Sequence, residues 1–148
     1  GGALMSRPLI IGFGNPLRED DGIGCRAAEL VQCEDADADV ITCRQLTPEL
    51  AEAVSGASMV VFLDASVSQA AGTVAVSAVT QETSDAWSHD LAPAMLTGLA
   101  QRTYGAAPAA FMISGGVAHL GWGEKLTSSA ERCAMEMAAE ASRLLRTR

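Results

Sequence analysis

The sequence predicts an α/β fold of three layers, in which helices cover both faces of a mostly parallel, twisted, five-stranded sheet. Short apolar runs rich in β-branched residues alternate with segments of helical period along the chain. These runs are continuously apolar, as in strands buried on both faces of a parallel sheet. With 148 residues, 49% of them hydrophobic, the chain can bury one sizeable core. We therefore expect one domain over residues 1–148, with residues 1–4 before Met5 a cloning remnant.

The first half of the chain contains three predicted strands and two predicted helices. The strands are residues 8–13, 40–43 and 59–63. The apolar face of the first helix consists of Ile23, Ala27, Leu30 and Val31. Asp20 or Asp21 stands at its expected N-cap, and an acidic loop follows at residues 34–39. The second helix is predicted to start with Thr47 as N-cap and Pro48 as first residue, and to end near residue 56.

The second half adds two strands and two helices. The predicted strands are residues 73–76 and 111–113, and the predicted helices are residues 91–100 and about 128–146. Residues 81–88 form a polar loop. The last helix has an apolar face and ends in arginines, which suit the negative end of its dipole. This face consists of Cys133, Met137, Ala141, Leu144 and Leu145.

The charge of the chain bears on its partners. The net charge is −8 and the sequence pI is about 4.6. This argues against a nucleic-acid partner, which needs clustered Lys and Arg, and against an anionic membrane surface. No apolar segment reaches the roughly 18 residues that a membrane span requires, and no signal peptide is recognised. We expect a cytoplasmic protein.

Four cysteines are present: Cys25, Cys33, Cys43 and Cys133. No two have the C-x-x-C spacing of a zinc or redox motif, and the chain is not a short, loop-rich secreted domain. We expect four reduced, mostly buried thiols.

A glycine-rich segment follows the first strand. It reads Gly12-Phe13-Gly14-Asn15-Pro16-Leu17-Arg18-Glu19-Asp20-Asp21-Gly22-Ile23-Gly24. A dinucleotide-binding motif is excluded because Leu17 stands at the third glycine position and three carboxylates would repel a pyrophosphate. A P-loop is excluded because no Gly-Lys-Ser/Thr follows. The segment therefore presents acids at a helix start, where Asp20 and Asp21 could equally be ordinary caps.

Two further residues could join this segment at one edge of the sheet. Asp64 follows the run at residues 59–63 and is placed at the carboxyl edge, where α/β sheets bind ligands, although an Asp can simply begin a turn there. His89 precedes an apolar helix, and the only other histidine, His119, is the weaker candidate. Two carboxylates and an imidazole suit Zn, Ni, Fe or Mn.

Two hydrolase classes do not fit. The sequence has no H-E-x-x-H zinc motif, and Ser114 lacks the first glycine of a G-x-S-x-G elbow. A zincin and a serine hydrolase are therefore disfavoured.

The glycine-rich segment closely resembles the opening of the hydrogenase maturation endopeptidases. Three later features match in the same order: Gln45-Leu46-Thr47-Pro48-Glu49-Leu50, the strand end at Asp64-Ala65, and Ser88-His89. The resemblance spans nearly the whole chain, although residues 106–123 match only loosely. It implies a three-layer α/β fold and an endopeptidase that removes the C-terminal extension of a nickel-iron hydrogenase large-subunit precursor after nickel insertion.

The resemblance also implies a set of metal-binding, catalytic residues. Carried over onto this sequence they are Asp21, Asp64 and His89, with Asp20 a competing choice for the first. Nickel would be brought by the substrate, and the enzyme would hold no permanent metal. Two other functions stay open at this point: a non-catalytic nickel carrier or chaperone for the large subunit, and a doubly wound domain that binds a small ligand.

Overall fold

The computed structural model describes residues 6–14, 22–35, 37–82, 91–118 and 126–147. Its strands are β1 (Leu9–Phe13), β2 (Asp39–Cys43), β3 (Met59–Ser66), β4 (Val74–Ala78) and β5 (Ala109–Gly116). Its helices are α1 (Ile23–Glu34), α2 (Leu50–Gly56), α3 (Pro93–Tyr104) and α4 (Ser128–Arg146). In this part of the chain, no helix combines the length and apolar character needed to cross a membrane.

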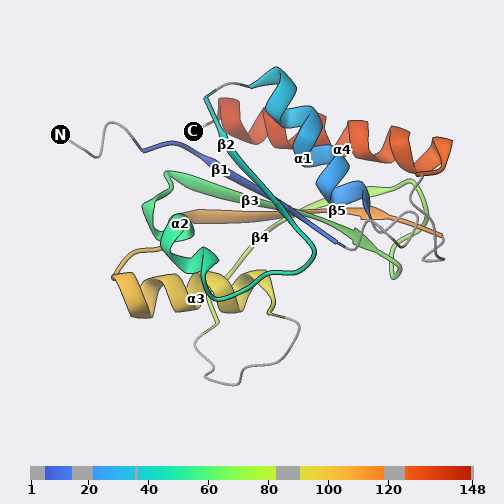
Figure 1. Cartoon of the computed structure of the whole chain (residues 1–148). Helices are drawn as coiled ribbons and strands as arrows, with labels where there is room; N and C mark the ends of the chain where they lie inside the picture. The colour runs from blue at the N-terminus through green and yellow to red at the C-terminus, as the bar shows by residue number, and fades with distance from the viewer. Residues whose placement is uncertain (1–5, 15–21, 36, 83–90, 119–125, 148) are drawn as a thin grey trace.

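The strands form one sheet in the order β2-β1-β3-β5-β4 (Figure 1). The β1–β2, β1–β3 and β3–β5 pairs are parallel, and β4 runs antiparallel to β5 at one edge. The predicted five-stranded, mostly parallel sheet is therefore confirmed. Edge strand β4 is largely exposed, with Val76 43% exposed.

Helices α1 and α4 cover one face of this sheet, and α2 and α3 cover the other (Figure 1). Alternate residues of each strand face opposite sides, which divides the core in two. Ile10, Val61 and Ile113 pack under α1 and α4, whereas Ile11 and Phe62 pack under α2 and α3. The three-layer prediction is confirmed.

Two predicted helix starts are wrong. The N-cap of α1 is Gly22, not Asp20 or Asp21, because the helix begins at Ile23. Helix α2 begins at Leu50, not at Pro48. Residues 47–49 form a turn in which the N–H of Leu50 donates to the carbonyl of Thr47 at 3.1 Å. No described side chain caps helix α2, so Thr47 does not cap it. The Thr47 side chain beside Glu49 lowers the pKa of the Glu49 carboxyl.

The prediction that the cysteines are mostly buried is also wrong. All four are free thiols, but only Cys133 is buried, at 2% exposure. Cys25 and Cys43 are half-buried. Cys33 is exposed because it lies off the apolar face that α1 forms with Ala27 and Val31.

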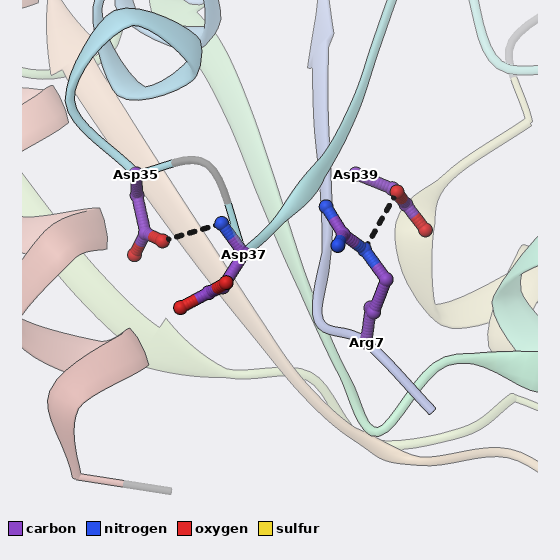
Figure 2. A network of polar contacts seen from close by, with 4 residues as sticks. All are labelled: Arg7, Asp35, Asp37 and Asp39. Carbon is purple, nitrogen blue, oxygen red and sulfur yellow. Dashed lines mark hydrogen bonds and ion pairs between the residues drawn. The ribbon is translucent and has the colours of Figure 1, made fainter. Parts of the chain in front are cut away.

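The acidic loop lies at the amino ends of the strands. The Arg7 guanidinium Nε donates to Asp39 Oδ1 at 3.0 Å, which joins the segment before β1 to the first residue of β2 (Figure 2). Asp35 accepts a hydrogen bond from the backbone N–H of Asp37 at 3.0 Å (Figure 2). These carboxylates therefore lie at the end of the sheet opposite the one where Asp64 lies.

Candidate functional site

The site predicted from the sequence is only partly described. Asp64 lies in β3. Asp21, its alternative Asp20, and His89 lie outside the described residues, as does His119. Within the described segments, no three His, Cys, Asp or Glu side chains form a group that could hold a metal ion.

Asp64 lies inside β3, not directly after it. The strand continues to Ser66 because β5 pairs with it as far as Gly116. On the other side, the pairing of β3 with β1 stops at Leu63, opposite Gly12. Asp64 is therefore the first residue of β3 beyond the β1 ladder, with its backbone still fixed by Ser114 of β5.

The carboxyl ends of β1 and β3 form a topological switch point. From β1 the chain passes through α1 to β2 on one side, and then through α2 on the opposite face to β3 on the other side of β1 (Figure 1). Connections that leave in opposite directions open a crevice at the carboxyl ends of such strands, and ligands of α/β proteins bind there. Asp64 is thus placed at the point of this sheet best suited to a ligand.

A pocket of about 390 Å³ lies at this switch point, and we call it the site pocket. Its lining comes from the carboxyl ends of β1, β2 and β3, from the middle of β5 and from the segment that leads into α3: Phe13, Gly14, Arg44, Gln45, Leu46, Asp64, Leu91, Ala92, Pro93 and Met112. Phe62 packs on the α2/α3 face, so strand alternation directs the side chain of Asp64 to the same face. The site pocket therefore joins a half-buried carboxylate to a largely apolar wall.

Two glycines of the first motif bring α1 against the ends of β1 and β3. A Cβ atom on Gly24 would collide with the carbonyl oxygen of Leu63 and lie 2.8 Å from that of Phe13. A Cβ on Gly12 would lie 2.7 Å from Cβ of Ala28. These glycines are therefore needed for close helix–strand packing. The motif thus shapes the backbone beside Asp64.

A polar cluster fixes β5 beside Asp64. The hydroxyl of Ser114, the partner of Asp64 in the β3–β5 register, donates to Oε1 of Gln69. Nε2 of Gln69 donates to the backbone carbonyls of Ser114 at 3.2 Å and of Thr73 at 3.3 Å. The loop after β3 is thereby tied to β5 on the side of Asp64 away from β1.

A second pocket of about 290 Å³ borders the first, and we call it the side pocket. Gly14 and Arg44 line both pockets, and Cys25, Glu29, Thr42 and Cys43 complete the side pocket. The thiol of Cys25 donates weakly to the carbonyls of Gly12 at 3.5 Å and Cys43 at 3.6 Å. Burial raises the pKa of the Cys43 thiol, so this thiol stays protonated at neutral pH.

Sequence reasoning missed most of the lining of the site pocket. Arg44 comes directly after β2, and Met112 lies within β5. Position after a strand would have indicated Arg44, as it indicated Asp64. Met112 gave no signal, because a methionine in an apolar strand is most often ordinary core.

No family model matches the chain, and no curated protein matches it. Solved structures do match. The hydrogenase maturating endopeptidase HybD from E. coli has a TM-score of 0.73 and 22% identity, over 95% of this chain and 93% of that chain. The [NiFe] hydrogenase maturation protease HycI from Thermococcus kodakarensis KOD1 has a TM-score of 0.74 and 19% identity, with the same coverage of 95% and 93%.

The hydrogenase 2 maturation peptidase from a Thaumarchaeota archaeon has a TM-score of 0.71 and 20% identity, over 97% of this chain and 100% of that chain. Several structural neighbours of this chain are thus hydrogenase maturation endopeptidases. The chain has their three-layer α/β fold over nearly its full length, as the sequence resemblance implied.

Proposed function

We propose that this chain is a cytoplasmic endopeptidase that removes the C-terminal extension of a nickel-iron hydrogenase large-subunit precursor after nickel insertion. Asp21, Asp64 and His89 recognise the nickel that the substrate carries. The enzyme needs no permanent metal of its own, because the metal arrives with the bond that is to be cut.

The position of Asp64 in the site pocket is the observation that carries this proposal. The two segments that hold the other expected ligands adjoin the described lining of the pocket. Asp21 directly precedes Gly22, the N-cap of α1, and α1 packs on the carbonyl of Leu63 through Gly24. His89 stands two positions before Leu91, which lines the pocket. The fold shared with known maturation endopeptidases supports the same assignment.

The chemistry follows from the residue types. Carboxylate and imidazole groups are suitable ligands for nickel. A nickel ion held by this chain and by its substrate would fix the scissile bond against the pocket and polarise its carbonyl or an attacking water. Positioning of this kind can contribute several kcal/mol to catalysis, roughly 7–11 kcal/mol at most.

A cleavage assay tests the proposal. The large-subunit precursor is incubated with the chain in nickel-loaded and nickel-free forms, and both samples are read by intact mass. Release of the C-terminal peptide from the nickel-loaded form alone is the expected result. Uncut precursor in both samples, with the chain bound to it, would contradict the proposal and indicate a nickel carrier or chaperone.

A further inference from the structure

We propose that Arg44 binds the carboxylate of an acidic side chain in the substrate, about three residues from the residue held at Asp64. An apolar side chain of the substrate, between the residues held at Asp64 and Arg44, would pack on the apolar wall of the site pocket. This inference rests on the proposed function, because the substrate is the same large-subunit precursor. It adds a residue that selects the sequence around the cleaved bond.

The first argument is the place of Arg44. It follows the last residue of β2, Cys43, and lines both the site pocket and the side pocket. The backbone N–H of Gly14 donates to the carbonyl of Cys43 at 3.1 Å, which extends the β1–β2 pairing up to Arg44. The backbone that carries this guanidinium is therefore held at the carboxyl edge of the sheet, beside the crevice.

The second argument is that Arg44 has no partner among the described residues. Arg7, Arg26 and Arg143 each form an ion pair with a carboxylate. Arg44 is exposed and makes no hydrogen bond or ion pair with any other described residue. Among the described residues no carboxylate pairs with this guanidinium, so in a chain of net charge −8 it can bind an external anion at the pockets that it lines.

The third argument is spacing. Strand β1 separates β2 from β3. At a strand spacing of about 4.8 Å, the backbones of β2 and β3 lie about 10 Å apart at this edge. An extended peptide advances about 3.3 Å per residue, so in a substrate that spans this distance the residue at Arg44 stands about three positions from the residue at Asp64.

The wall between these points is apolar. Phe13 and Leu46 come from the β1 and β2 side of the site pocket, and Leu91 and Met112 come from the α3 and β5 side. Leu46 and Leu91 are 2% and 6% exposed, so they anchor this wall in the core. A peptide with an apolar residue beside its metal-binding end and an acidic residue further along matches this order of surfaces.

Binding to the nickel-loaded precursor, read by fluorescence anisotropy of a labelled chain, tests this inference. Arg44→Gln should raise the Kd about tenfold, because a charge-assisted hydrogen bond at a partly exposed site is lost. Arg44→Glu should raise it further, through repulsion of the acidic side chain. Arg146→Gln is the matched control, because Arg146 is an exposed arginine on α4 that does not line either pocket, and its Kd should not change.

The substrate side provides the complementary change. Each Asp or Glu within four residues of the cleaved bond is changed in the precursor to Asn or Gln. One of these changes should raise the Kd of the wild-type chain about tenfold. The same change should leave the Kd of Arg44→Gln as it is, because that variant has already lost the contact. A Lys at the same position should restore binding to Arg44→Glu. If no neutralised precursor loses affinity, the acidic side chain is not the ligand and the inference is wrong.

The outcome is separable from that of the proposed function. The Kd is read from the anisotropy on mixing, before the precursor is cut, so a chain that binds but does not cut would overturn the endopeptidase proposal alone. Equal Kd values for the wild type and Arg44→Gln would overturn the Arg44 inference alone, even if the precursor is cut. A wild-type chain that does not bind the precursor would overturn both.

Discussion

A Cβ atom on Gly24 would collide with the carbonyl oxygen of Leu63. The first turn of α1 therefore lies directly on β3, one residue before Asp64. This contact joins the two parts of the sequence that matter most to the proposed function: the glycine-rich first motif and the strand that carries the acid.

Gly24→Ala should lower the free energy of unfolding by about 1–3 kcal/mol, because α1 must move away from β1 and β3 to admit the methyl group. Urea unfolding followed by far-UV circular dichroism measures this change. Cleavage should also fall, because the same movement displaces the backbone next to Asp64.

Gly56→Ala is the matched control. Gly56 is the last residue of α2, and a Cβ there would have no heavy atom within 4 Å. The free energy of unfolding of Gly56→Ala should stay within about 0.5 kcal/mol of that of the wild type. If both variants lose the same stability, the loss reflects glycine replacement in a helix and not the contact with Leu63.

The Thr127 hydroxyl caps α4. Its Oγ1 accepts a hydrogen bond from the backbone N–H of Ala130 at 3.1 Å. Thr127→Ala should destabilise the chain by about 1 kcal/mol, whereas Thr127→Ser should cost far less, because serine keeps the capping oxygen. Thermal unfolding of both variants measures the difference. Equal melting temperatures for Thr127→Ala and Thr127→Ser would contradict the capping role.

The thiols should differ in reactivity in the order of their exposure. At pH 8, Cys33 should be alkylated first because it is exposed, and buried Cys133 last. Cys43 should react more slowly than Cys33, because a raised pKa leaves less thiolate at that pH. The rate of Cys43 should still rise with pH above the ordinary pKa range of a free thiol. Iodoacetamide labelling with peptide mass spectrometry measures each rate, and a Cys43 rate that levels off within that ordinary range would be the contrary result.

Local sequence signals were sufficient where a helix or strand is fixed by its own residues. Helix α4 runs from Ser128 to Arg146, as its apolar spacing predicted, because a long amphipathic helix is specified by its own period. Strand β1 was predicted to within one residue, since it is an apolar run that ends in glycines.

Features that depend on neighbours were not predicted. Asp64 was expected after β3, but pairing with β5 extends that strand to Ser66. Thr47 was expected to cap α2, but the helix begins three residues later, at Leu50, and no side chain in the described part of the chain caps it. Arg44 could not be placed near Asp64 without the strand order, because these two residues are twenty positions apart and belong to different strands.

The most direct test of the endopeptidase proposal compares the wild type with Asp64→Asn on the nickel-loaded precursor. This change keeps the size of the half-buried side chain and removes its charge. Glu52→Gln is the control, because this exposed carboxylate lies on α2, outside the site pocket. We expect Asp64→Asn to lower kcat/KM at least about 100-fold, the loss typical of a group that stabilises a transition state, with little change in melting temperature. Cleavage by Asp64→Asn at the wild-type rate would contradict the proposed role of this carboxylate.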